Sequence, residues 1–184
     1  PTTPDQYQRL HFHVGYQLNV PLDNRISKPM QVKFKDSTLQ DRLEKDGYAT
    51  VRLVDQSSVE NLRNGFNTLG DGSGAGFHCT MFNPDHDYRR KVDATIKAEI
   101  GHAVSELFVN SQMLYANFMV KESGQEGDFF VHQDWTYVDE ETDNSLAVWF
   151  PLVDLNEKNG ALHMVPGSHR MKNLVRGPGV ADPL

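Results

Sequence analysis

Residues 129–135 read Phe-Phe-Val-His-Gln-Asp-Trp and carry the strongest structural signal in this chain of 184 residues. On a β-strand, residues two apart point to the same side, so His132 and Asp134 are predicted to project together. An imidazole and a carboxylate held side by side can supply two ligands of a metal site that uses two histidines and one carboxylate. The same spacing also occurs in an ordinary hydrogen-bonded surface pair. The apolar neighbours favour a buried strand, where such polar groups need a partner or a metal to offset desolvation.

Closely spaced strand-like segments surround this motif, and polar turns separate them. They are predicted at residues 113–121, 129–137, 145–155 and 161–165. Short strands at this spacing are typical of an antiparallel sandwich or barrel. The second half of the chain therefore predicts most of the sheet.

Three helices are predicted earlier in the chain. Two of them begin with capping-box patterns and end at a glycine, the first from Ser37 to Gly47 and the second from Ser57 to Gly70. The third and longest follows the Asn-Pro-Asp turn at 83–85 and carries one apolar stripe. Strands are also predicted at residues 10–20, 48–54 and 77–82. Helices followed by closely spaced strands indicate an α+β fold.

Composition excludes several classes of function. The net charge is −7, from 18 basic and 25 acidic residues, and the basic residues are scattered, so a nucleic-acid-binding surface is not expected. The apolar run at 146–153 is far too short to span a bilayer, so no membrane association is expected. With Cys79 as its single cysteine the chain has no internal disulfide, which weakly favours a reducing compartment and leaves a secreted protein without disulfides as the alternative. We expect a cytoplasmic protein. The glycines of residues 71–76 lack the spacing of a phosphate-binding loop.

Four runs of residues extend the motif toward the C-terminus. They are His132-Gln133-Asp134, Trp149-Phe150-Pro151-Leu152-Val153-Asp154, Asn159-Gly160-Ala161-Leu162 and Val165-Pro166-Gly167-Ser168-His169-Arg170. In order and spacing they resemble the phytanoyl-CoA dioxygenase family of Fe(II)/2-oxoglutarate-dependent oxygenases. The resemblance covers about residues 36–175 and is most specific over residues 111–170.

The resemblance implies a double-stranded β-helix, the cupin-like jelly roll, with N-terminal and flanking helices. It implies Fe(II) and 2-oxoglutarate as cofactors, with succinate and CO2 as co-products. His132 and Asp134 match the family's catalytic metal ligands, whereas Trp149 and Asn117 match positions that face 2-oxoglutarate. Without the resemblance, Trp149 would equally fit core packing, and Asn117 an ordinary polar strand position.

The family's third metal ligand is a later histidine, which is followed by an arginine that binds 2-oxoglutarate. His163 and His169 lie too early in the pattern to take that role. We therefore expect residues 1–184 to be a single oxygenase domain whose last strands, with the missing histidine and arginine, lie beyond Leu184. Related halogenases have a small residue at the position of Asp134, so a carboxylate there favours hydroxylation or another oxidation over halogenation.

The predicted function is the hydroxylation, or another oxidation, of a small organic substrate. The alternative is a non-catalytic jelly-roll protein that binds a small molecule without a metal. A zinc hydrolase of cupin form is disfavoured because no general base stands near the pair in sequence. The sequence leaves the identity of the substrate, the type of oxidation and the oligomeric state open.

Overall fold

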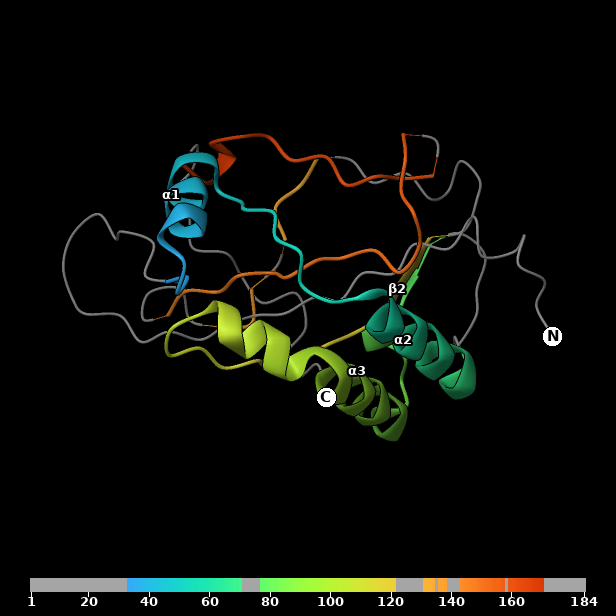
Figure 1. The fold of residues 1–184 in the computed structure, drawn as a ribbon. Helices are drawn as coiled ribbons and strands as arrows, with labels where there is room; N and C mark the ends of the chain where they lie inside the picture. The colour runs from blue at the N-terminus through green and yellow to red at the C-terminus, as the bar shows by residue number, and fades with distance from the viewer. Residues whose placement is uncertain are drawn as a thin grey trace.

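The computed structural model describes residues 33–70, 77–121, 131–134, 136–138, 143–157 and 159–170. Its elements, in chain order, are α1 (Ser37–Asp46), α2 (Gln56–Leu69), β1 (Phe77–Cys79), the 3-10 helix η2 (Thr80–Phe82), α3 (His86–Leu107), β2 (Met119–Lys121) and the 3-10 helix η4 (Ser168–Arg170) (Figure 1). The described part is α+β, with three α-helices and a two-stranded antiparallel sheet. The predicted strand at 10–20 and the loop at 71–76 lie outside the described residues.

The long helix α3 forms the main core together with α2, beside which it lies in Figure 1. The predicted apolar stripe is confirmed, because its central residues are almost completely buried: Val92, Ile96, Ile100 and Val104. Residues at this spacing share one face of a helix. From α2, Leu62 and Phe66 join the same core. Burying an aliphatic side chain of this size contributes roughly 1.5–3 kcal/mol, so this interface anchors the helical side of the fold.

An aspartate side chain caps the N-terminus of each of the first two helices. An oxygen of Asp36 accepts hydrogen bonds from two backbone N–H groups in the first turn of α1, at 2.7 and 3.1 Å. Asp55 likewise accepts from the N–H of Ser58 at 2.9 Å at the start of α2. The prediction of capping boxes with Ser37 and Ser57 as the N-caps is therefore wrong, since both serines lie inside the helices. A carboxylate accepts the free N–H groups and also favours the positive end of the helix dipole.

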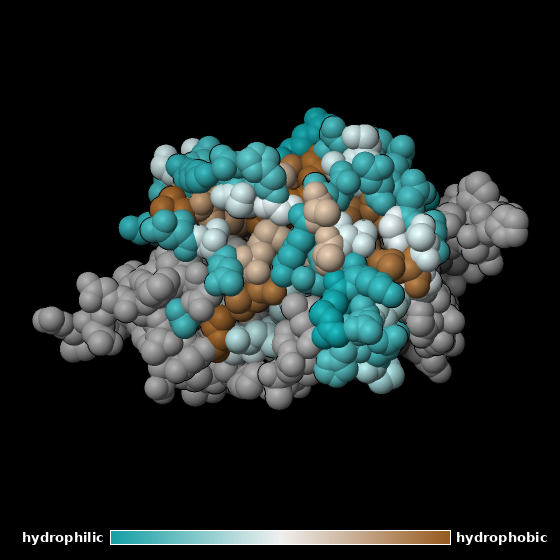
Figure 2. Space-filling view, turned by 90° about the horizontal axis from the view of Figure 1, so that it is seen from below, coloured by the Kyte–Doolittle hydropathy of each residue, from teal (hydrophilic) through white to brown (hydrophobic). Residues whose placement is uncertain are grey.

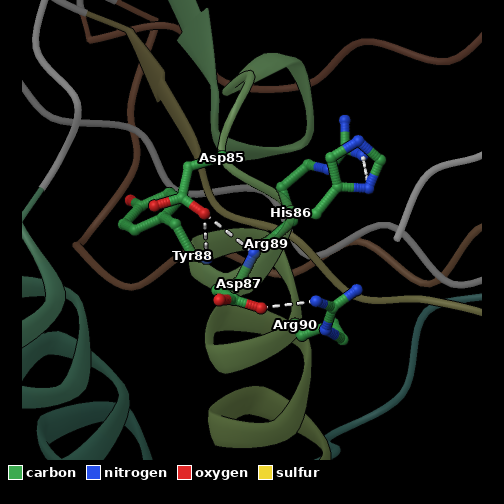
Figure 3. Close-up of polar contacts among 6 residues, drawn as sticks. All are labelled: Asp85, His86, Asp87, Tyr88, Arg89 and Arg90. Carbon is green, nitrogen blue, oxygen red and sulfur yellow. Dashed lines mark hydrogen bonds and ion pairs between the residues drawn. The ribbon is translucent and has the colours of Figure 1, made fainter.

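The start of α3 follows the same rule, as Figure 3 shows. Asp85 accepts from the N–H groups of Asp87 and Tyr88 at 2.8 and 3.2 Å. Within this turn Asp87 pairs with Arg90. Arg89 is buried, and one of its terminal nitrogens lies 3.0 Å from Nδ1 of His86. The cap and these contacts hold the first turn of α3 in place after the turn that follows η2.

The two strands β1 and β2 pair with Phe77 opposite Lys121 and Cys79 opposite Met119. The predicted strand at 77–82 is thus confirmed only for its first three residues, because the rest forms η2. The segment 48–54 contains no strand, contrary to prediction.

The strand predicted for residues 113–121 is confirmed only at β2, but an alternation of buried side chains extends before it along the chain. Ala116, Phe118 and Val120 pack into the main core. Tyr115 and Met119 belong instead to a second, smaller cluster that is centred on Cys79, Met81 and Tyr115 and that we call the Cys79 cluster. A period of two places alternate side chains on opposite faces. Asn117 therefore lies on the face of the Cys79 cluster.

A similar alternation runs through the segment 146–152. Its even-numbered residues, which are Leu146, Val148, Phe150 and Leu152, all pack in or against the main core. This segment nevertheless forms no strand, nor do residues 161–165 or the described part of 129–137. Pattern alone does not make a strand, which also needs ladder hydrogen bonds to a neighbour. Across the described ranges, a double-stranded β-helix is therefore not shown.

The surface is mixed in character. Figure 2 shows apolar side chains that reach the surface between hydrophilic areas. The exposed large apolar residues include Phe82, Val131, Leu162, Met164 and Val165. None of the helices in the described ranges has the length and apolar character needed to cross a membrane.

Candidate metal and cosubstrate site

His132 and Asp134 converge, as the spacing predicts. Nε2 of His132 lies 3.3 Å from Oδ1 of Asp134. The two side chains are 52% and 51% exposed, and the preceding Val131 is 90% exposed. The prediction that the pair is buried in an apolar strand is therefore wrong. Being open to solvent, the pair contributes little to stability as an ion pair, because exposed pairs are typically worth about 0–1 kcal/mol.

The separation of these two atoms is compatible with binding one metal ion. Two ligand atoms, each about 2.1 Å from a metal and at right angles to one another, are about 3.0 Å apart. The observed 3.3 Å is close to this value, and about half of each side chain is exposed to solvent. A neutral imidazole nitrogen and a carboxylate oxygen are also the donor types that non-haem Fe(II) sites use.

A third ligand is not found in the part of the chain that the structure describes. No group of three or more His, Cys, Asp or Glu side chains there could hold a metal ion. His132 and Asp134 therefore account for two arms of a possible metal site.

Three contacts anchor the segment that follows His132 and Asp134. The hydroxyl of Thr136, which is fully buried, lies 3.0 Å from that of Ser145. The Tyr137 hydroxyl donates to Sδ of Met81 at 3.5 Å, and the Tyr137 ring meets that of Tyr115 edge-on with centroids 4.6 Å apart. Through these contacts, Thr136 and Tyr137 hold the segment that follows His132 and Asp134 against the edge of the Cys79 cluster.

The two tyrosines remain neutral beside a carboxylate. Burial raises the pKa of Tyr115 far above its usual range, and its hydrogen bond to the Tyr137 hydroxyl and the charge of Asp134 act in the same direction. Burial also raises the pKa of Tyr137, with a smaller contribution from Asp134. The two phenols therefore place hydroxyl groups and aromatic surface, but no negative charge, near Asp134.

Sequence reasoning did not find this tyrosine pair. Tyr115 lies two residues before Asn117 and so shares its face of the strand, which was a usable signal. Tyr137 follows Asp134 by three residues, and an odd spacing on a strand predicts opposite faces, so the sequence offered no reason to place them together. Its contact with Tyr115 comes from the tertiary structure alone.

Asn117 is buried, with 1% of its surface exposed. Its Oδ1 accepts a hydrogen bond from the thiol of Cys79 at 3.1 Å. Its Nδ2 is buried and has no hydrogen-bond partner in the described part of the chain. Buried donors are almost always paired in proteins, so a free amide N–H group on this face fits an oxygen-rich ligand such as 2-oxoglutarate.

Trp149 lies outside both apolar clusters. Its neighbours Val148 and Phe150 pack in or against the main core, so the alternation turns Trp149 to the other side of the segment. The indole is partly buried and belongs to neither the main core nor the Cys79 cluster. Whether Trp149 faces the cosubstrate or packs as a core residue stays a prediction, which its partial burial leaves for experiment.

His169 contacts the C-terminal end of α1. Its Nε2 lies 3.2 Å from the carbonyl oxygen of Glu44, and Arg170 donates to the same oxygen at 3.1 Å. Positive side chains are favourable at this end of a helix. His163 is exposed. Neither histidine lies in a cluster that could hold a metal among the described residues.

Comparison with protein families matches residues 77–183 to the family described as Phytanoyl-CoA dioxygenase (PhyH). The matched range contains His132, Asp134, Asn117 and Trp149, and it excludes α1 and α2. Among curated proteins, "Phytanoyl-CoA dioxygenase domain-containing protein 1" of Danio rerio is 31% identical over 80 residues. That match covers 41% of this chain but only 28% of the relative.

No solved structure matches the chain. The family match covers more than half of the chain and includes every residue of the candidate site, and the curated relative carries the same family name. The resemblance inferred from the four sequence runs is thereby confirmed. The chain belongs to the phytanoyl-CoA dioxygenase family.

Proposed function

We propose that the protein is an Fe(II)/2-oxoglutarate-dependent dioxygenase that hydroxylates, or otherwise oxidises, a small organic substrate. The observation that carries the proposal is the convergence of His132 and Asp134, whose ligand atoms lie 3.3 Å apart within the family-matched range. Histidine and carboxylate donors presented on one side of a metal leave neighbouring coordination positions free for other ligands.

In this proposal each residue has a defined task. His132 and Asp134 hold the iron, which together with 2-oxoglutarate and O2 supplies the oxidising chemistry and yields succinate and CO2. Asn117 offers its free Nδ2–H to an oxygen of 2-oxoglutarate. Trp149, turned away from the main core, provides an apolar wall. The neutral pair of Tyr115 and Tyr137 restricts water on the side of Asp134.

We further propose that the alternating segments at 115–121 and 146–152 belong to a jelly roll within one oxygenase domain. Both segments send every second side chain into the main core. A sheet that is buried on one face produces this pattern. The small molecule is expected to bind on the opposite face, where Asn117 and Trp149 lie.

The test is turnover of 2-oxoglutarate by the full chain supplied with Fe(II) and ascorbate in air. Succinate should form, at least slowly without a substrate, and Asp134→Ala should abolish its formation. The matched control is His163→Ala, which removes an exposed histidine outside the site and should retain the parent rate. Equal succinate formation by the parent and Asp134→Ala would refute the assignment.

A metal-free binding protein is the second candidate, and the lack of a third ligand in the described ranges favours it. Iron titration separates the two. The dioxygenase should bind Fe(II) more tightly than a variant carrying both His132→Ala and Asp134→Ala. If the parent and this double variant bind iron equally, the binding protein becomes the better description.

A further inference from the structure

We propose that Cys79 is a positioning residue, whose thiol fixes the amide of Asn117 so that Nδ2 donates to an oxygen of bound 2-oxoglutarate. The inference rests on the proposed function and adds to it a role for a buried cysteine. It starts from three features of the pair: the contact between the two side chains, the direction of the thiol hydrogen and the unpaired amide nitrogen.

The contact comes from the pairing of β1 with β2. Cys79 lies opposite Met119, and Asn117 precedes Met119 by two residues on the same face. Sγ of Cys79 and Oδ1 of Asn117 are 3.1 Å apart. The exposed fractions of the two residues are 5% and 1%, so water does not compete for this hydrogen bond.

The chemistry of the buried thiol sets the direction of the hydrogen bond. Burial raises the pKa of Cys79 to about 12, and the backbone N–H of Met81, which donates to the sulfur, offsets this only in part. The thiol therefore keeps its hydrogen at neutral pH and acts as the donor. An amide oxygen is a far better acceptor than an amide nitrogen, so the oxygen of Asn117 faces the sulfur.

With the oxygen held by Cys79, the amide NH2 group must point elsewhere. Nδ2 finds no acceptor among the described residues. The gap beside Asn117, lined also by Thr80, Arg89 and Tyr115, has no room for a water molecule. A ligand oxygen can therefore reach Nδ2 only when a side chain that lines this gap moves. Side-chain rotations of this kind are common on binding.

Three variants and one double variant test the assignment. The measurement is the dissociation constant for 2-oxoglutarate, by calorimetry, with Mn2+ replacing Fe(II) so that no turnover occurs. Cys79→Ala should weaken binding about tenfold, the value of one hydrogen bond. Cys79→Ser keeps a donor and should restore affinity to within about threefold. Asn117→Ala should weaken binding at least as much as Cys79→Ala, and combining the two should add little, because Cys79 acts through Asn117.

The outcomes separate this inference from the proposed function. If the parent binds 2-oxoglutarate and Cys79→Ala binds it equally well, the positioning role is refuted while the dioxygenase proposal stands. Weaker binding by both Cys79 variants would likewise count against the role, since only packing would then explain the loss. If the parent with Mn2+ binds no 2-oxoglutarate, the proposed function fails and this inference fails with it. Mn2+ affinity should be the same in all variants, since none alters His132 or Asp134.

Discussion

His169 lies against Gly47 so closely that a Cβ atom on the glycine would overlap the imidazole ring. Gly47 ends α1 with φ at +84°, in the left-handed region. The N–H of Gly167 donates to the carbonyl of Asp46 at 2.7 Å, and His169 and Arg170 both contact the carbonyl of Glu44. The turn that carries the family-like Pro-Gly-Ser-His run therefore closes the C-terminal end of α1. Its role in the described structure is to join two distant parts of the chain.

Gly47→Ala should destabilise the protein through two separate effects. The left-handed backbone costs about 1 kcal/mol with a side chain, and the clash with His169 adds roughly 1–3 kcal/mol. The matched control is the same substitution in a His169→Ala background, where the backbone cost remains but the overlap with the imidazole is removed. Urea unfolding should show the larger loss for Gly47→Ala when His169 is present. Equal losses in the two backgrounds would mean that the contact between Gly47 and His169 does not limit stability.

The helix caps give a test of a corrected prediction. Asp36→Ala removes the side chain that accepts two backbone hydrogen bonds, and it should lower the free energy of unfolding by about 1 kcal/mol. Ser37→Ala changes the neighbouring residue, which lies inside α1, and its effect should stay within about 0.5 kcal/mol. The free energy of unfolding of both variants, measured by chemical denaturation, shows whether Asp36 or Ser37 caps the helix. A larger loss for Ser37→Ala would restore the capping box as the start of this helix.

Local patterns predicted the helices well because a helix is determined largely by residues within a few positions of each other. The stripe of α3 and the glycine ends of α1 and α2 follow directly from the sequence. The capping error arose because Asp36 and Ser37 are both good caps, and the sequence does not say which one adopts the extended backbone of an N-cap.

Long-range contacts explain what sequence reasoning could not supply. The family resemblance assigned Asn117 and Trp149 to the cosubstrate side, but the sequence did not say which segments pair into strands. The spacing of His132 and Asp134 indicated that they converge, yet not their exposure, since that depends on what packs above them. The contact of Tyr137 with Tyr115 and the hydrogen bond of Cys79 to Asn117 each join separate segments.

Stability should fall at alkaline pH because of the tyrosine pair. Tyr115 and Tyr137 both have a raised pKa in the folded protein, mainly through burial, whereas a tyrosine in the unfolded chain titrates near pH 10. The contribution of the two tyrosines to the free energy of unfolding is therefore fully present below about pH 10. It is lost as the pH rises further, because the tyrosines of the unfolded chain ionise first and stabilise that state. The variant with Tyr115→Phe and Tyr137→Phe lacks this effect. Its free energy of unfolding should fall less between pH 9 and pH 11 than that of the parent.

The same slope in the parent and in this double variant would contradict the prediction. Comparing the two slopes removes the contribution of lysines and other groups that titrate in this range, since these are common to both proteins. The absorbance of ionised tyrosine, followed as the pH is raised, measures the ionisation independently of stability. Two of the six tyrosines should resist ionisation until the protein unfolds.

Trp149 and Phe150 are adjacent in sequence but should respond oppositely to truncation. Phe150 is 9% exposed and belongs to the main core, so Phe150→Ala should cost about 3–5 kcal/mol of stability. Trp149 faces away from that core, so Trp149→Ala should cost clearly less, although it removes a larger side chain. If Trp149 lines the cosubstrate site, its truncation should instead weaken binding of 2-oxoglutarate, measured with Mn2+ in place of Fe(II). The free energy of unfolding and the dissociation constant for 2-oxoglutarate should be measured for both variants. A loss of stability at Trp149 as large as that at Phe150, with binding unchanged, would make Trp149 a core residue and remove it from the proposed site.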